Sequence, residues 1–121
     1  MPIYSVLVVD DSMTELTYLS EMLRKAGYVV STARGSEEAQ RHLEQSKPDL
    51  ILMDVVMPGK NGFQLTRLLS GDPRYAEVPI IICSSKNQEV DRAWGLRQGA
   101  RDYIVKPVNR TELINKIKAL E

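Results

Sequence analysis

Short apolar runs alternate with longer segments of helical periodicity along the chain. Strand-length runs occur at five places, and the first, third and fourth are nearly all aliphatic. Aliphatic runs of this kind are typical of strands buried on both faces of a parallel sheet. The alternation predicts an α/β fold in which helices cover both faces of one such sheet. The predicted strands are residues 4–9, 28–33, 50–53, 79–83 and 101–105.

Capping residues, glycine and proline mark five helices between and after these strands. Residues 12–15 have the spacing of a capping box, which predicts a first helix that stops at Gly27. Ser36 is predicted to cap a second helix that ends before Pro48. Residues 70–78 contain glycine and proline and are predicted to form an exposed loop. The remaining helices are expected from near Asn61, Asn87 and Asn109 through Leu69, Gln98 and Leu120.

Length and composition narrow the class of protein. The 121 residues predict one domain, 1–121, without an output domain, and 43% hydrophobic residues are enough to form a core. Sixteen basic and sixteen acidic residues cancel, which argues against nucleic acid or membrane binding through net charge. A single cysteine and a single histidine exclude an internal disulfide and a multi-histidine or cysteine zinc site. Without a signal or membrane segment, the expected location is the cytoplasm.

Polar side chains follow four of the predicted strands where each strand ends. In an open parallel sheet, ligands bind outside the carboxyl ends of the strands. Three carboxylates gathered there repel one another by about 3 kcal/mol per pair, so they require positive charge. A lysine supplies one charge, and Mg²⁺, which prefers oxygen ligands, supplies two more. The residues concerned are Asp10, Asp11, Asp54, Ser84, Ser85 and Lys106.

Each of these residues also has an ordinary structural explanation. Asp10 and Asp11 are suited to capping the first helix, Asp54 to starting a turn, and Lys106 to a solvated strand end. Four strands that all end in groups suited to one metal and phosphate site favour the functional interpretation.

Four segments resemble, in order, the signatures of response-regulator receiver domains. They are residues 8–12, 54–62, 84–85 and 99–107, and the resemblance covers essentially the whole chain. It implies a doubly wound, flavodoxin-like receiver fold with strand order 2-1-3-4-5 and five surrounding helices.

The resemblance also implies a role for each residue of the site. Asp54 is the expected phosphoacceptor from a histidine kinase or from acetyl phosphate, and Lys106, followed by a cis bond to Pro107, is expected to pair with the phosphoryl group. The implied cofactor is Mg²⁺. Its expected ligands are Asp11, Asp54 and the backbone carbonyl of Val56, with Asp10 acting through a water molecule.

Ser84 and Tyr103 are the expected switch residues. Ser84 is expected to hydrogen-bond the new phosphoryl group while Tyr103 turns from an outward to an inward position. The face made by the fourth helix, fifth strand and fifth helix would then dock a target protein. Receivers more often have threonine where this chain has Ser84, and the apolar Val56 and nearby Lys86 leave the phosphoryl lifetime open.

Residues 11–15, 62–67 and 94–103 look most like single-domain regulators of type IV pilus twitching motility. A phosphate sink in flagellar-type chemotaxis and an interaction module independent of phosphorylation remain alternatives. A phosphohydrolase of the haloacid dehalogenase type fits less well, since it needs an aspartate where Val56 stands, and a nucleotide-binding flavodoxin relative lacks its phosphate loop. We therefore expect no enzymatic activity other than self-phosphorylation and self-dephosphorylation. The chain is expected to be a monomer, and dimerisation on phosphorylation is left open.

A few chemically conspicuous residues are interpreted as structural. Cys83 is expected in the core and His42 on a helix face. Trp94 is suited either to the core or to a docking surface, and Arg92, Arg97 and Arg101 to a solvated face or a partner contact.

Overall fold

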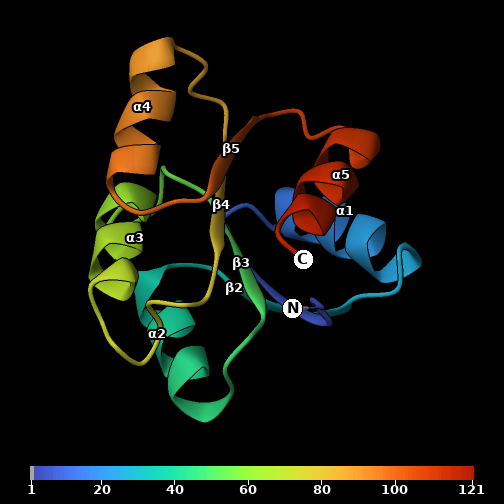
Figure 1. Ribbon diagram of the computed structural model, residues 1–121, viewed down its shortest axis with the longest axis horizontal. Helices are drawn as coiled ribbons and strands as arrows, with labels where there is room; N and C mark the ends of the chain where they lie inside the picture. The colour runs from blue at the N-terminus through green and yellow to red at the C-terminus, as the bar shows by residue number, and fades with distance from the viewer. Residues whose placement is uncertain (1) are drawn as a thin grey trace.

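Five parallel strands form one sheet in the computed structural model, which describes residues 2–121 (Figure 1). Their order is β2-β1-β3-β4-β5, as expected for the receiver fold. The aliphatic strands β1, β3 and β4 lie at the centre, as their composition predicts. The strand bounds agree with the prediction to within one residue. They are β1 (Ser5–Val9), β2 (Val29–Ala33), β3 (Leu50–Met53), β4 (Ile80–Ser84) and β5 (Asp102–Val105).

Helices cover both faces of the sheet, so the core has two halves. Successive strand residues point to opposite faces. In β1, Leu7 and Val9 belong to one buried cluster, and Val6 and Val8 to the other. The first cluster lies under α2 (Ser36–Gln45), α3 (Gly62–Ser70) and α4 (Glu89–Arg97); the second lies under α1 (Met13–Lys25) and α5 (Arg110–Ala119) (Figure 1). Among residues 2–121, no helix has the length and apolar character needed to cross a membrane.

The helix starts correct two details of the sequence prediction. Ser36 does not cap α2: Gly35 is the N-cap, and the Ser36 hydroxyl accepts a hydrogen bond from Gln40 inside the helix at 3.0 Å. At α1, Ser12 accepts a hydrogen bond from the Glu15 backbone, but Glu15 Oε2 is buried without a partner. Only half of the predicted capping box forms there, whereas Asn61 and Gln64 form a complete box at α3.

The segment 70–78 is only partly the exposed loop that its glycine and proline predict. Tyr75 and Val78 are buried in the cluster beneath α2 and α3. The Tyr75 hydroxyl donates a hydrogen bond to the carbonyl of Leu43 at 3.2 Å, so the segment is packed against α2. Two apolar side chains are therefore enough to bury part of a segment whose glycine and proline predict an exposed loop.

Asp49, the residue before β3, forms hydrogen bonds with the start of β1. We expect its substitution to lower the stability of the protein in a pH-dependent way. Its Oδ2 accepts hydrogen bonds from the backbone N–H groups of Tyr4 (2.9 Å) and Ser5 (3.1 Å). The Tyr4 bond is the main reason that the pKa of Asp49 lies below its usual value. We expect Asp49→Asn to lower the free energy of unfolding at neutral pH by about 1 kcal/mol.

A lowered carboxyl pKa stabilises the folded state above the unfolded pKa, and the contribution is lost as the pH falls through the folded value. Urea unfolding of both proteins at neutral pH and at about pH 2 measures this dependence. The two free energies should converge in acid. An equal difference at both pH values would show that the charge of Asp49 contributes nothing.

Candidate functional site

The carboxyl ends of the strands bring the predicted acidic residues together. Asp10 and Asp11 follow β1, and Asp54 follows β3. One carboxylate oxygen from each of the three lies within 4.8 Å of the others. Asp10 and Asp54 are buried, whereas Asp11 is exposed at the mouth of the cluster. The grouping predicted from the sequence is therefore present in the structure.

Lys106, which follows β5, neutralises part of this negative charge. Its Nζ lies 2.7 Å from Asp10 Oδ2 and 3.2 Å from Asp54 Oδ1. Burial lowers the pKa of Lys106, but the bond to Asp10 and the charges of Asp54 and Asp10 outweigh burial and leave it raised. The ammonium group is thus held in its charged form between two buried carboxylates. The bond from Lys106 to Pro107 is cis, as predicted.

The environment of Asp54 disfavours its charged form. Burial raises the pKa of Asp54, the negative charge of Asp10 raises it further, and Lys106 opposes both effects only in part. An additional cation would relieve this repulsion. Ionisable groups with conflicting neighbours of this kind are concentrated at functional sites.

Backbone contacts fix the two acidic loops. Asp10 Oδ1 accepts a hydrogen bond from the N–H of Ser12 at 3.0 Å, and Ser12 in turn caps α1. After Asp54, the N–H of Gly62 donates to the carbonyl of Val55 at 2.8 Å, which places the start of α3 directly against the loop. A Cβ atom on Gly62 would overlap the Asp54 carbonyl oxygen and come within 2.9 Å of Val55 Cα. Only glycine fits this position.

The donor set fits a hard divalent cation. Three carboxylates in close range offer the oxygen ligands that Mg²⁺ prefers, and the exposed Asp11 leaves the cluster open to solvent and to a phosphate group. Asp11 and Asp54 are the direct ligands expected from the resemblance, and the roles of the Val56 carbonyl and of Asp10 through water stay predictions. The Val56 side chain is 62% exposed and contributes no polar group.

Ser84 and Tyr103 meet at the segment that follows β4. Ser84 is buried, and its Oγ accepts a hydrogen bond from the N–H of Lys86 at 3.1 Å. The Tyr103 hydroxyl donates to the carbonyl of Lys86 at 2.8 Å, and its ring is buried. Burial also raises the pKa of the Tyr103 phenol. The two expected switch residues thus share one backbone segment, and Tyr103 occupies the inward position here.

Two contacts at this edge were not predicted from the sequence. The Tyr18 hydroxyl on α1 donates to the carbonyl of Val108 at 2.7 Å, which ties α1 to the segment just after Lys106. Arg34 Nη2 donates to the carbonyl of Asp11 at 3.4 Å. The position of Arg34 directly after β2 is a sequence signal for its place at the carboxyl edge, whereas nothing in the helical pattern singles out Tyr18.

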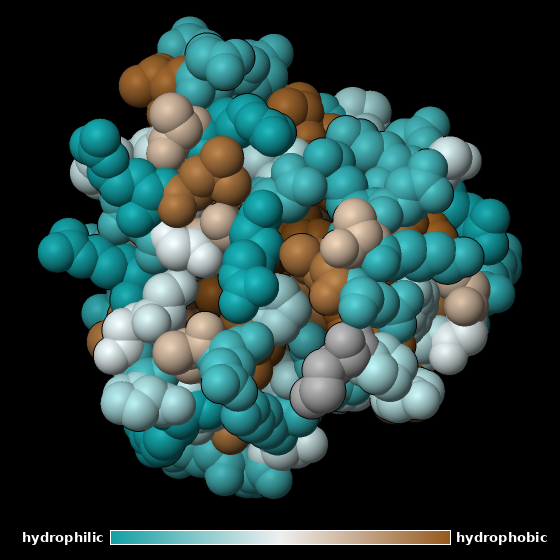
Figure 2. Space-filling view, in the orientation of Figure 1, coloured by the Kyte–Doolittle hydropathy of each residue, from teal (hydrophilic) through white to brown (hydrophobic). Residues whose placement is uncertain are grey.

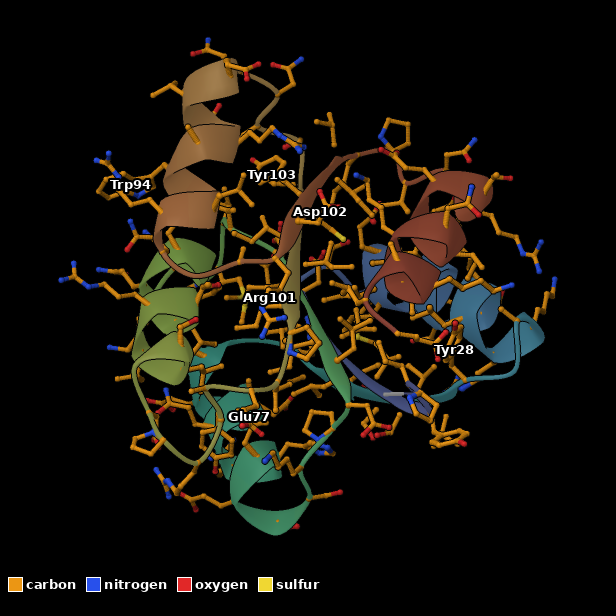
Figure 3. All side chains as sticks on the ribbon, in the orientation of Figure 1. Tyr28, Glu77, Trp94, Arg101, Asp102 and Tyr103 are labelled. Atoms are coloured by element: carbon orange, nitrogen blue, oxygen red, sulfur yellow. The ribbon has the colours of Figure 1, made fainter. Side chains whose placement is uncertain are left out.

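The structure decides between the interpretations of the conspicuous residues. Cys83 is buried in the core as expected, and burial raises its thiol pKa to about 12, so it is inert at neutral pH. His42 lies on α2 and is partly exposed. Trp94 is 47% exposed and points outward from α4 (Figure 3), which excludes the core alternative. Figure 2 shows further hydrophobic surface over the same helix.

A family model, sequence relatives and solved structures all identify the receiver domain that the sequence resembles. The family model described as the response regulator receiver domain matches residues 6–118. Protein PilH of Pseudomonas aeruginosa is 48% identical over 115 residues, which cover 95% of each chain. The phosphate regulon transcriptional regulatory protein PhoB of the same organism is 36% identical over 96% of this chain, but the match spans only 51% of PhoB. The structure of chemotaxis protein CheY4 of Vibrio cholerae superposes with a TM-score of 0.91 and 29% identity, covering 99% of this chain and 100% of that one.

Proposed function

Because this chain belongs to the response regulator receiver domain family, we propose that it accepts a phosphoryl group on Asp54 from a histidine kinase and thereby changes a protein-docking surface. The observation that carries the proposal is the meeting of Asp10, Asp11 and Asp54 within 4.8 Å, with Lys106 bonded to two of them. A solvated lysine or a simple helix cap would not require this convergence. We propose no catalytic activity beyond the chain's own phosphorylation and dephosphorylation.

In the proposed transfer, an Asp54 carboxylate oxygen attacks the phosphorus of a phosphohistidine. The new P–O bond forms as the P–N bond breaks, and the imidazole leaves with its electron pair and takes up a proton. Mg²⁺, when bound, supplies positive charge to the phosphoryl oxygens. Lys106 Nζ lies 3.2 Å from Asp54 Oδ1, so its ammonium group is close enough to Asp54 to stabilise a phosphoryl group formed there.

The signal is proposed to leave the site through Ser84. Its Oγ accepts a hydrogen bond from the Lys86 N–H and is in hydrogen-bonding reach of the Tyr103 hydroxyl. A hydroxyl carries one hydrogen that it can donate, and we propose that Ser84 turns this hydrogen towards a phosphoryl oxygen. The Tyr103 hydroxyl donates a hydrogen bond to the Lys86 carbonyl. A movement of the backbone at Lys86 therefore changes the hydrogen bond that holds the Tyr103 side chain. Charge-assisted hydrogen bonds contribute about 1.5 to 3 kcal/mol each, so two or three of them are sufficient to invert a two-state equilibrium.

We propose type IV pilus twitching motility as the process that this regulator serves. The proposal is supported by the resemblance of residues 11–15, 62–67 and 94–103 to regulators of that system and by the 48% identity to PilH.

Phosphotransfer from a candidate histidine kinase tests the proposed function. The kinase is labelled with radioactive ATP, this protein is added with Mg²⁺, and transfer and decay of the label are followed. We expect the label to move to this protein within the time of mixing and to be released as phosphate. A kinase of the same pathway that keeps its label would contradict the assignment. Target binding that beryllofluoride, a phosphoryl mimic, leaves unchanged would favour a module independent of phosphorylation.

A further inference from the structure

The edge strand β5 carries a charged cluster between α4 and α5 that the phosphorylation site does not use. Asp102, the first residue of β5, lies beside Tyr103 in the space between the two helices (Figure 3). The cluster consists of Asp102, Arg92 of α4 and Lys116 of α5, and we call it the Asp102 cluster. Its members come from the three elements that make up the expected docking face.

The contacts of Asp102 reach both helices and the strand itself. Lys116 Nζ donates to both carboxylate oxygens of Asp102, at 3.0 and 3.1 Å. Arg92 Nη2 lies 3.7 Å from Asp102 Oδ1, and Arg92 Nη1 donates to the Tyr103 carbonyl at 3.4 Å. The N–H of Tyr103 donates to Asp102 Oδ1 at 2.8 Å. The backbone of the expected switch residue is therefore held by Asp102 on one side and by Arg92 on the other.

The packing of α4 makes these polar contacts important. Gly95 is the only buried residue of α4, whereas α5 buries Leu113 and Ile117. A Cβ atom at Gly95 would lie 3.2 Å from the Tyr103 ring, so α4 rests directly on that ring. Apart from the contacts of Gly95 with Ile82, Tyr103 and Phe63, α4 buries no side chain against the sheet, so its position relative to β5 depends also on Arg92.

We propose that Asp102 is a positioning residue that joins α4 to α5 across β5 and stabilises the inward position of Tyr103. This inference rests on the proposed function of the Asp54 site. Coupling between two sites is reciprocal: a cluster that favours the inward position of Tyr103 also favours binding of the phosphoryl group. Loss of the cluster should therefore weaken the affinity for a phosphoryl mimic at a distance from the site.

The test measures beryllofluoride binding in the presence of Mg²⁺, followed by the fluorescence of Trp94, the only tryptophan and a residue of α4. We expect Arg92→Met and Asp102→Asn each to weaken binding about fivefold. The loss of affinity in the double variant should be smaller than the product of the two single losses, since the Arg92–Asp102 ion pair is removed in all three variants. Arg97→Met is the matched control. Arg97 lies on the same helix, and its side chain makes no hydrogen bond or ion pair within residues 2–121, so the affinity of this variant should equal that of the unmodified protein.

Hydrogen exchange of the α4 amides, measured without any phosphoryl mimic, tests the cluster independently of phosphorylation. Exchange should be faster in Arg92→Met and Asp102→Asn but unchanged in Arg97→Met. Unchanged exchange in all three variants, unchanged beryllofluoride affinity, or an equal loss in Arg97→Met would overturn the proposal. If the unmodified protein fails to bind beryllofluoride, the proposed function of Asp54 fails, and the exchange rates still decide the role of Asp102.

Discussion

Asp54→Asn is expected to abolish phosphorylation by acetyl phosphate and, at the same time, to make the protein more stable. The amide oxygen of asparagine is a poor nucleophile, and the substitution removes one of the two carboxylates beside Lys106. Intact-protein mass measured after incubation with acetyl phosphate and Mg²⁺ should show no added phosphoryl group. A full mass shift in this variant would refute the assignment of Asp54.

The expected gain in stability follows from the charges around Asp54. Burial and the negative charge of Asp10 raise the pKa of Asp54, so ionised Asp54 destabilises the folded state at neutral pH. Protonation in acid relieves this cost, and asparagine relieves it at every pH. Lys106 keeps its bond to Asp10, so no buried charge is left without a partner. Thermal unfolding without Mg²⁺ should show a higher melting temperature for the variant near pH 7, with the difference shrinking in acid.

Asp49→Asn is the matched control for this experiment. It makes the same chemical change in the carboxylate of Asp49, which lies at the amino ends of β1 and β3, whereas the acidic site lies at their carboxyl ends. Its phosphorylation should equal that of the unmodified protein while its stability at neutral pH falls. A loss of phosphorylation in both variants would mean that the assay reports general disruption of the fold.

Gly62→Ala is expected to have the second largest effect, through the backbone around Asp54. The added methyl group would overlap the Asp54 carbonyl oxygen and lie 2.8 Å from the carbonyl carbon, so either α3 or the acceptor loop must move. Overlap with backbone is not relieved by a side-chain rotation. We expect a loss of about 3 kcal/mol in the free energy of unfolding, measured in urea, together with much slower phosphorylation of the folded fraction.

Gly71→Ala, at the other end of the same helix, separates this effect from the general cost of adding a methyl group. Gly71 has φ of −88°, which suits any residue, and a Cβ atom there would approach the carbonyl oxygens of Arg67 and Leu68 at 3.4 and 3.9 Å, without overlap. We expect stability and phosphorylation close to those of the unmodified protein. Equal losses in the two variants would contradict a special role for the contact between Gly62 and Asp54.

The strands were predictable because each depends on many residues at once, whereas their order followed from the resemblance to receiver domains. β1, β3 and β4 are buried on both faces, so each is a nearly continuous aliphatic run. Such a run is recognised as a strand even when its predicted ends are wrong by one residue. A helix start depends on the backbone of a single residue. At α2 the prediction chose Ser36 because serine is a common cap, but the helix begins one residue earlier, after Gly35, and the Ser36 hydroxyl bonds Gln40 within the helix.

The acidic site was predictable for a similar reason, since every member follows a strand at the same edge of the sheet. The sequence left the position of Trp94 open because the hydrophobic periodicity of α4 is weak. In the structure, the buried residue of α4 is Gly95, which fixes the orientation of the helix. Gly95 faces Ile82 and Tyr103, and the preceding residue, Trp94, lies about 100° around the helix axis and is exposed to solvent. The Asp102 cluster was not predicted, because Arg92 and Lys116 become neighbours only through the packing of α4 and α5 against β5.

The magnesium dependence of phosphoryl uptake tests the central claim most directly. The protein is incubated with acetyl phosphate, with Mg²⁺ or with a chelator, and the intact mass and the modified residue are determined by mass spectrometry. We expect one phosphoryl group per chain, located on Asp54 and present only with Mg²⁺, because the carboxylates of Asp10, Asp11 and Asp54 require a cation before a phosphate can approach. Equal modification in the chelator, or a phosphoryl group on another residue, would contradict the account.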